Sequence, residues 1–207
     1  PTGRRLDEMG EALNQGVERL QEHYGFGKLH VVAHSMGGLV ARSFITKSLL
    51  RDGNDYIGEF ISISTPWGGH EAAGLGARHS PMVVPSWYDL DPGSEFQLTS
   101  FAQSLQGKVR HTLIYGYRAS DSVLLPREND GSVSVASQLL PVVVSESAEV
   151  KGFDDTHVGI LSNQEVLQPR TGIPRALRRR FPGEAHQVFG ALLAQPPFER
   201  LVSQVED

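Results

Sequence analysis

The stretch LHVVAHSMGGLVAR, residues 29–42, passes from a short apolar segment through a cluster of small residues into a helical pattern. Ser35 stands at the centre of the cluster, in AHSMGG. One interpretation is that small side chains let a helix pack closely against a sheet. The other is a nucleophile elbow, in which a strand turns sharply into a helix and presents the serine hydroxyl at the tip.

The patterns on either side of this turn predict alternating helices and strands. Apolar residues recur at helical spacing over four segments: 6–24, 37–50, about 165–180 and 184–194. Strand-like apolar segments occupy 29–33, 59–64 and 111–117, with weaker candidates at 142–144 and 149–153. Such alternation is typical of an α/β fold with a mostly parallel sheet. In these sheets reactive groups collect at the carboxyl ends of the strands.

Length and composition restrict the kind of protein. The 207 residues, of which 39% are hydrophobic and 21% charged, predict one globular domain over residues 1–207. Gly, Pro, Ser and aromatic residues dominate between about 70 and 108, where we expect a cap. The net charge of -5 argues against a nucleic-acid partner, and the absence of cysteine excludes thiol catalysis, disulfides and thiolate metal sites. The sequence contains no apolar run long enough to span a bilayer.

Small residues around Ser35 are what a nucleophile elbow requires. Side chains larger than those of Ala33, Gly37 and Gly38 are expected to collide with the neighbouring strand or helix. The start of the helix places the backbone N–H of Met36 near the serine, where it can donate to an oxyanion. The usual pattern has glycine two residues before the serine, and alanine takes that place here.

Two later loops supply the partners that a nucleophilic serine needs. A serine hydroxyl needs a base, and the base needs a carboxylate to hold its tautomer. The loop NDGSVSVAS follows the predicted strand 111–117 and contains Asp130, and DDTHVGILSN follows 149–153 and contains His157. Serine, acid and histidine come in the order expected on this fold. We therefore predict Ser35 as nucleophile, Asp130 as acid and His157 as general base.

With these loops in place, the chain resembles the lipase and esterase branch of the α/β-hydrolase superfamily. AHSMGGLVAR resembles the elbow of bacterial lipases, and ISISTPWGG is similar to a strand and turn of lecithin:cholesterol acyltransferase and phospholipase relatives. DLDPGSEFQLTS resembles their cap region, NDGSVSVAS their acid loop and THVGILSN their histidine loop. The resemblance spans residues 29–163. It implies a three-layer αβα fold with a mostly parallel sheet, the roles given above, and neither cofactor nor metal.

The resemblance also implies a second oxyanion donor, on a loop after an early strand. That strand would precede the segment 6–24, and nothing in the sequence corresponds to it. We expect the N-terminal strands and the second donor to be absent from this chain, and any signal peptide to lie upstream of Pro1. Loss of one donor costs about a hundred- to a thousandfold in turnover, so we expect the chain alone to be weakly active or inactive.

Other residues compete for the catalytic roles. Strand alternation turns His34 away from the serine, which favours a packed or supporting position for it. Asp121 is the alternative acid, with a turn residue as its simpler interpretation. Asp154 and Asp155 flank His157, where a solvated turn is favoured over a cation site. The histidines that rival His157 are His34, His70, His79, His111 and His186.

Two further groups bear on the substrate. Trp67, Trp87 and Tyr88 are candidates to line an acyl pocket, although aromatic residues near a cap are equally ordinary core. A group of arginines in this acidic chain either attracts anionic lipid head groups or forms a solvated helix face, and the second is favoured. These arginines are Arg170, Arg175, Arg178, Arg179 and Arg180.

The predicted function is hydrolysis of a lipid or other hydrophobic ester through an acyl-enzyme. The preference for lipid rests on the resemblance, since fold alone does not fix a substrate. One alternative is an acyltransferase that passes the acyl group to an alcohol. Another is a lipid-binding relative that has lost catalysis. Peripheral membrane contact, the compartment, the acyl chain length and the oligomeric state are left open by the sequence.

Overall fold

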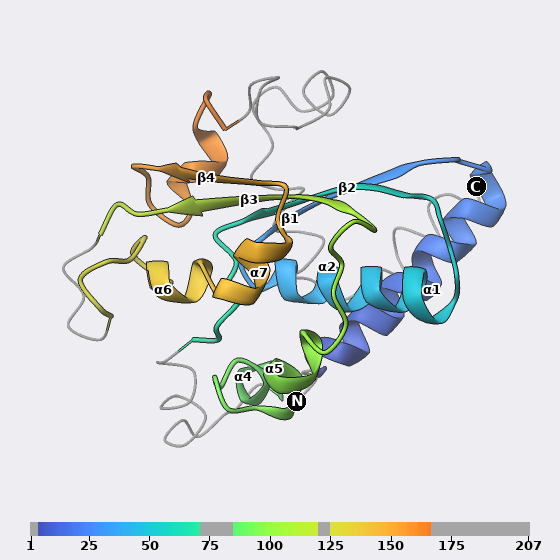
Figure 1. The fold of residues 1–207 in the computed structure, drawn as a ribbon, viewed down its shortest axis with the longest axis horizontal. Coiled ribbons are helices and arrows are strands. Elements are labelled where there is room, and N and C mark those ends of the chain that lie inside the picture. Colours follow the sequence, from blue (N-terminus) through green and yellow to red (C-terminus); the bar gives the residue numbers. More distant parts are fainter. Residues whose placement is uncertain (1–3, 71–84, 120–124, 167–207) are drawn as a thin grey trace.

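The computed structural model describes residues 4–70, 85–119 and 125–166, and helices alternate with strands along them (Figure 1). The helices are α1 (Leu6–Tyr24), α2 (Gly37–Thr46), α4 (Pro85–Asp89), α5 (Glu95–Ser100), α6 (Val135–Gln138) and α7 (Pro141–Glu146). A π-helical turn, η1 (Lys47–Arg51), continues α2, and a 3-10 turn, η2 (Gly159–Ser162), follows the last strand. The strands are β1 (Leu29–His34), β2 (Ile57–Ile63), β3 (Arg110–Gly116) and β4 (Glu149–Phe153).

The four strands form one parallel sheet in the order β1-β2-β3-β4, which is also their order along the chain. Their carboxyl ends therefore meet at a single edge. Helices α1, α2 and α7 lie on one side of the sheet, whereas η2 lies on the other (Figure 1). This arrangement confirms the predicted α/β fold with a parallel sheet.

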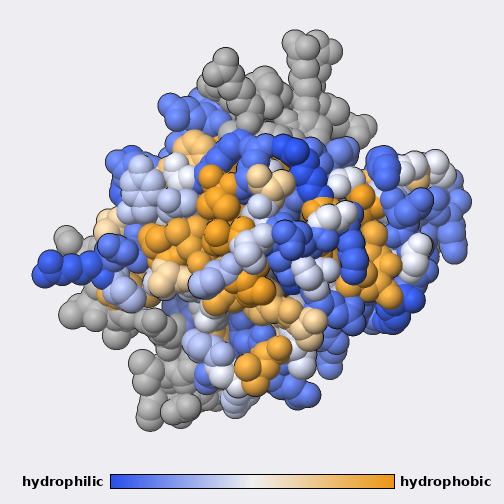
Figure 2. Space-filling model, in the orientation of Figure 1, coloured by the Kyte–Doolittle hydropathy of each residue, from blue (hydrophilic) through white to orange (hydrophobic). Residues whose placement is uncertain are grey.

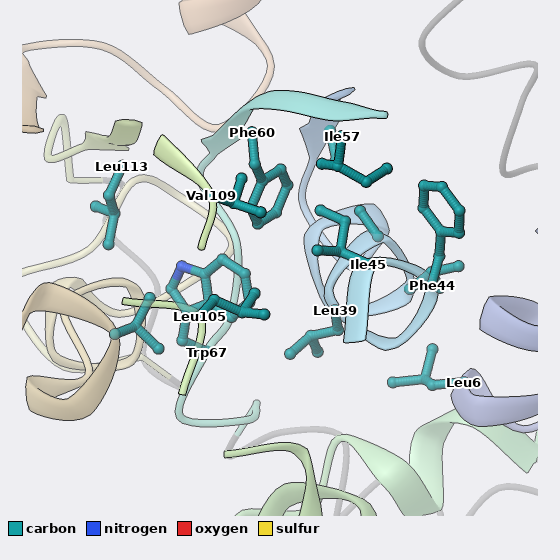
Figure 3. Packing of buried hydrophobic residues seen from close by; sticks show 14 of the residues in the cluster. Leu6, Leu39, Phe44, Ile45, Ile57, Phe60, Trp67, Leu105, Val109 and Leu113 are labelled. Carbon is teal, nitrogen blue, oxygen red and sulfur yellow. The ribbon is translucent and has the colours of Figure 1, made fainter. Parts of the chain in front are cut away.

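Each face of the sheet carries apolar core. The larger cluster fills the space between the sheet and the helices and includes Phe44 of α2, Phe60 of β2 and Trp67 (Figure 3). On the opposite face, Ile61 and Ile63 of β2 and Ile114 of β3 form a second cluster with Ile160 of η2. Strands of parallel sheets are buried on both faces, which explains why they read as continuous apolar runs in the sequence.

Most predicted elements agree with the structure. The helix α1 begins and ends where the helical spacing does, and Gly25 ends it with a φ of 61°, a left-handed conformation that glycine adopts at no steric cost. The predicted helix 37–50 corresponds to α2 together with η1, and the ends of β1 and β2 differ from the predicted ones by one or two residues. The helix predicted at about 165–180 lies outside the described residues apart from positions 165 and 166, and the helix predicted at 184–194 lies outside them entirely.

The prediction of a strand at 142–144 is wrong, because these residues belong to α7. Three consecutive valines favour a strand by propensity. Pro141, however, occupies the first turn of the helix, where its fixed φ suits helical geometry. The helical conformation also buries Val143 completely while Val142 remains partly exposed. Burial against the core therefore outweighs the propensity of the valines.

Part of the predicted cap, residues 85–108, carries α4 and α5 and is tied to the helical layer. The buried carboxylate of Asp89 accepts a hydrogen bond from the backbone N–H of Leu6, the first residue of α1, at 2.7 Å. Arg42 of α2 donates to the carbonyls of Ser100 and Gln103, at 3.0 and 3.2 Å. This half of the cap is thus fixed to α1 and α2, while residues 71–84 lie outside the described residues.

The surface shows where apolar side chains remain uncovered. On the face seen in Figure 2 they gather over the middle of the molecule, around α7 and towards α5. Val142 and Leu98 contribute to the exposed apolar surface, and Leu98 is 72% exposed. None of the helices within residues 4–70, 85–119 and 125–166 combines the length and the apolar character needed to cross a membrane.

Candidate active site

Ser35 lies at the sharp turn between the end of β1 and the start of α2. Its φ of 55° is positive, which is uncommon for a residue with a side chain and costs backbone strain. Its N–H donates to the carbonyl of Ile63 at the end of β2, at 2.8 Å, and its carbonyl accepts from the N–H of Gly38, at 3.0 Å. These bonds hold the strained turn, whose geometry is that of a nucleophile elbow.

Gly38 shows why the turn needs small residues. A Cβ at this position would overlap with the side chain of Thr65, which follows the end of β2. The first turn of α2 can therefore approach the neighbouring strand end only when residue 38 has no side chain. Ala33, two residues before the serine, is buried in the core between sheet and helices. The steric prediction made for Gly38 is confirmed.

The side chains of Ser35, His157 and Asp130 form a chain of hydrogen bonds at the carboxyl edge of the sheet. Ser35 Oγ is 2.9 Å from His157 Nε2, and His157 Nδ1 is 2.8 Å from Asp130 Oδ2. An ionised carboxylate only accepts hydrogen bonds, so Nδ1 carries the proton and donates it to Asp130. Nε2 then has a lone pair that can accept the proton of the serine hydroxyl. The structure brings the three predicted residues together, and their catalytic roles stay predictions.

Asp130 has a buried carboxylate that is well supplied with donors. Oδ1 accepts from the N–H groups of Ser132 and Val133, at 3.0 and 2.7 Å, and Oδ2 accepts from His157. Burial by itself raises the pKa of Asp130. The hydrogen bond and charge of His157, with the two backbone N–H groups, outweigh this effect and hold the pKa below its ordinary value of 3.8. Asp130 is therefore ionised at neutral pH and suited to stabilise a histidine cation.

The loop after β4 carries His157 across the edge of the sheet towards β1. It passes close to Gly116 at the end of β3, where a Cβ would lie 2.8 Å from the carbonyl oxygen of Asp155. The backbone N–H of His157 donates to the carbonyl of Asp130 at 2.7 Å. The glycine thus leaves room for the loop, and Asp130 holds His157 by backbone and side chain together.

Gln138, which carried no signal in the sequence, fixes the loop of the acid. Its buried side-chain oxygen accepts from the N–H of Gly116 at 3.1 Å. Its amide group donates to the carbonyls of Gly116 and Val133, at 3.1 and 3.3 Å. Because the N–H of Val133 binds Asp130, this glutamine connects the end of β3 to the donors of the carboxylate. A single glutamine in a short helix resembles any polar surface residue until its neighbours in space are known.

The backbone N–H of Met36 follows Ser35 directly, at the residue that precedes α2. Among the described residues no carbonyl or side chain accepts a hydrogen bond from it. This donor is available to an oxyanion that forms at Ser35, in the position that acyl transfer requires. Its catalytic use, and the location of a second donor outside this chain, stay predictions.

The rival residues occupy other positions. His34 and His70 each bind a backbone carbonyl, that of His157 at 2.8 Å and that of Ser132 at 2.6 Å respectively. His111 is buried in the core, where serine hydroxyls bind both of its ring nitrogens. Three further rivals lie outside the described residues: Asp121, His79 and His186.

Asp154 and Asp155 have partners within their own part of the fold. Arg118 lies 3.2 Å from the carboxylate of Asp154 and 3.9 Å from that of Asp155. Asp155 also accepts from the side-chain amide of Asn163 at 2.7 Å. In the described part of the chain, no group of three or more His, Cys, Asp or Glu residues is placed to hold a metal ion.

The three aromatic candidates for an acyl pocket differ in position. Trp67 is 0% exposed and packs edge-on against Phe60 inside the core, so it offers no surface to a substrate in this structure (Figure 3). Trp87 is partly buried and Tyr88 is 51% exposed, both in α4 of the cap. Contact of these two residues with substrate stays a prediction. The arginines at 170–180 lie outside the described residues.

Known proteins match part of the chain in sequence. Residues 4–74 match the lecithin:cholesterol acyltransferase family. Over 58 residues the chain is 36% identical to the lysosomal phospholipase A and acyltransferase of the dog, Canis lupus familiaris. This alignment covers 28% of the chain but 14% of the dog protein, so the chain corresponds to only a small part of that relative.

Solved structures share the fold over more of the chain. The lipase BlEst2 of Bacillus licheniformis in its propeptide form is 17% identical, with 82% of this chain and 41% of that one covered and a TM-score of 0.62. Its mature form is 16% identical, with 80% and 72% covered and a TM-score of 0.57. Phospholipase PlaB of Legionella pneumophila is 19% identical, with 65% and 34% covered and a TM-score of 0.52.

At such identities a structural likeness shows the fold alone, and the fold is that of the α/β-hydrolases. The sequence match to the lecithin:cholesterol acyltransferase family adds a relationship to lipid-acting proteins. Together these findings confirm the resemblance to the lipase and esterase branch of the α/β-hydrolase superfamily.

Proposed function

We propose that this chain carries the catalytic centre of a serine ester hydrolase. The observation that supports this proposal best is the continuous hydrogen-bond chain from Asp130 through His157 to Ser35, with the serine on a strained elbow. A buried structural serine needs neither a histidine with a free lone pair nor an ionised carboxylate behind that histidine. The arrangement is the one that turns a hydroxyl into a nucleophile.

Acylation of the serine is the first half of the proposed reaction. Ser35 Oγ attacks the carbonyl carbon of the ester while its proton passes to His157 Nε2. The carboxylate of Asp130 stabilises the resulting histidine cation, and the N–H of Met36 donates to the oxyanion. Collapse of the tetrahedral intermediate breaks the bond to the alcohol oxygen, which takes the proton from His157. The alcohol leaves and the acyl group remains on Ser35.

Deacylation repeats the same steps with water. His157 accepts a proton from a water molecule whose oxygen attacks the acyl carbonyl. A second tetrahedral intermediate forms and collapses, the carboxylic acid leaves, and the proton returns from His157 to Ser35 Oγ. The centre is thereby restored, and no cofactor takes part in this sequence of steps. The proposed substrate is a lipid or another ester with an apolar acyl chain, because the family match and the dog relative both concern lipids.

Covalent labelling combined with ester hydrolysis tests the proposal. A fluorophosphonate probe is expected to label the wild-type chain and not Ser35→Ala, and p-nitrophenyl esters of graded acyl length give the substrate preference. Ser64→Ala is a matched control. Ser64, like Ser35, directly follows a strand and has a positive φ, of 48°, but its side chain is buried. It lies outside the proposed mechanism, and its variant should keep labelling and turnover.

The result that would contradict the proposal is equally specific. Labelling of Ser35→Ala at the wild-type rate would mean that another serine reacts. A wild-type chain that is folded, resists the probe and hydrolyses no ester would favour the lipid-binding alternative. Labelling without turnover would support Ser35 as the nucleophile. It would indicate that turnover needs the second oxyanion donor, which we expect to be absent from this chain.

Acyl transfer to an alcohol is the second candidate function. It is favoured by the match of residues 4–74 to a family named for an acyltransferase, and by the dog relative, whose name includes both activities. The acyl-enzyme would be the same, and an alcohol oxygen would replace water in the second half. Product analysis with and without an added long-chain alcohol separates the two. New ester without free acid would exclude plain hydrolysis.

A further inference from the structure

His34 is placed against His157, although strand alternation turns it away from the serine beside it. It is the last residue of β1 and precedes Ser35 directly. Its Nε2 lies 2.8 Å from the backbone carbonyl oxygen of His157. The two imidazole rings are tilted against each other with their centroids 4.6 Å apart. His34 therefore contacts both the backbone and the ring of the proposed base.

The chemistry of the contact fixes the protonation state of His34. A carbonyl oxygen only accepts hydrogen bonds, so Nε2 of His34 carries a proton and donates it. Burial, and next the charge of His157, lower the pKa of His34 to about 4. His34 is thus a neutral donor at neutral pH.

His157 is held at both ends of its backbone. Its N–H donates to the carbonyl of Asp130, and its carbonyl accepts from His34. The next residue, Val158, is 60% exposed. The bond from His34 therefore holds the backbone of His157 directly before an exposed residue of the loop.

We propose that His34 is a positioning residue, which holds the backbone and ring of His157 so that Nε2 of His157 points at Ser35. The inference rests on the proposed function, since it concerns the same centre. A donor on residue 34 links the elbow to the loop of the base, so that nucleophile and base move as one body. A shift of about 1 Å in such a centre costs roughly a hundredfold in rate.

Two substitutions separate the donor from the bulk of the side chain. His34→Phe keeps a ring against His157 but cannot donate, whereas His34→Gln keeps an N–H group at a similar reach. For a soluble ester we expect kcat to fall by about ten- to a hundredfold in His34→Phe, with KM within about twofold of wild type. His34→Gln should recover most of the loss. His30→Gln, on the same strand but far from the centre, is the control and should match wild type.

A spectroscopic measurement reads the position of His157 without turnover. The proton on His157 Nδ1, held by Asp130, is expected to give a downfield NMR signal that is missing in His157→Gln. In His34→Phe this signal should broaden and exchange faster with water, and in His34→Gln it should return. Thermal unfolding of each variant shows whether the fold is intact.

The outcomes test the role of His34 and the proposed function separately. Wild-type kcat and an unchanged Nδ1 signal in His34→Phe would overturn the role of His34, and so would a His34→Gln variant as impaired as His34→Phe. If the folded wild-type chain neither reacts with the fluorophosphonate probe nor hydrolyses an ester, the proposed function fails, and the NMR measurement alone decides whether His34 positions His157.

Discussion

At the scale of single residues, backbone groups hold the candidate site more than side chains do. The carboxylate of Asp130 is oriented by two backbone N–H groups, the loop of His157 by a backbone carbonyl, and the elbow of Ser35 by the carbonyl of Ile63. Backbone atoms have few ways to move once the sheet has formed. The three reactive side chains are therefore positioned by the fold itself, and small changes among them should act on chemistry before they act on stability.

Asp130→Asn tests the direction of the hydrogen bonds, from Ser35 through His157 to Asp130. The amide of asparagine can donate towards His157 Nδ1, which favours the tautomer that carries its proton on Nε2 and cannot accept from Ser35. We expect kcat to fall on the order of a thousandfold or more. The kcat of a soluble ester and the rate of fluorophosphonate labelling measure the effect. If Asp130→Asn kept more than a tenth of the wild-type labelling rate, another acid would have to serve the site.

His111 makes stability depend on pH. Burial, with a smaller effect of the charge of Arg42, lowers its pKa from 6.5 to about 3. As the pH falls below 6.5 towards 3, the unfolded chain takes up a proton here that the folded protein refuses. The free energy of unfolding should therefore fall with decreasing pH in this window, with about 1.4 kcal/mol per pH unit due to this residue.

Urea unfolding between pH 7 and pH 4 measures this dependence. His111→Gln should be less stable than wild type at pH 7 but should show a flatter decline, because glutamine does not titrate. His23→Gln, on the exposed side of α1, is the control and should keep the wild-type slope. Equal slopes in wild type and His111→Gln would show that other groups cause the loss in acid.

The residues that we propose to react carry a signature in the sequence, whereas the residues that contact and hold them do not. Ser35, Asp130 and His157 could be predicted because each sits in a short motif just after a strand, in a fixed order. Gln138 and His34 act through contacts with residues far along the chain, which no local pattern encodes. Trp67 illustrates the opposite error, because an aromatic residue beside a motif is as well suited to core as to substrate.

At the scale of elements, α2 joins the elbow to α7 through a buried ion pair and to the cap through contacts with Phe101 and the backbone. Arg42 Nη1 lies 2.7 Å from a carboxylate oxygen of Glu146 in α7, and both side chains are almost fully buried. The guanidinium also lies 4.8 Å from the ring centre of Phe101. The helix α2, which follows the elbow, thus makes polar contacts both with the cap and with α7.

The pair provides a stability prediction with an internal control. Glu146→Ala leaves a buried charge without its partner and should cost about 3–5 kcal/mol in the free energy of unfolding. A double-mutant cycle with Arg42→Met should give a strong coupling energy. The exposed pair of Arg51 and Glu11 has the same 2.7 Å distance, and its coupling should stay below about 1 kcal/mol. Equal coupling in both pairs would contradict the importance of burial.

The elements themselves could largely be predicted, because their apolar periodicity follows from burial. The helix α1 matches its predicted limits, since it has one clear apolar stripe that ends at Gly25. The strand β4 also matches its predicted limits, although its pattern is weaker. Residues 142–144 differ because strand propensity and tertiary burial oppose each other there, and burial is stronger. The order of the strands within the sheet depends on long-range pairing and could only be expected by analogy.

At the scale of the whole molecule, Asp89 connects the cap to the first helix. It binds the N–H of Leu6 at the start of α1, and its side chain is 2% exposed. The cap therefore cannot leave the helical layer without exposing an unpaired helix end. Motion of this half of the cap should be coupled to opening of the first turn of α1.

Asp89→Ala should uncouple the two parts. The N–H of Leu6 would lose its acceptor, at a cost of about 1–3 kcal/mol for a buried unpaired donor. Hydrogen exchange should accelerate at the first turn of α1 and at α4. Asp91→Ala is the control, because the carboxylate of Asp91 accepts a local hydrogen bond from the N–H of Gly93, two residues further along the chain. Unchanged exchange at Leu6 in Asp89→Ala would show that the contact contributes little.

The hydrogen bond from Ser35 to His157 joins residues 122 positions apart. A ribosome releases the elbow first and the loop of His157 only after β2, β3 and β4 have been made. A nascent chain therefore holds the serine through the synthesis of 122 further residues without the base that we propose to activate it. Under the proposed mechanism, Ser35 therefore cannot take up an acyl group until the ribosome has released the loop that carries His157.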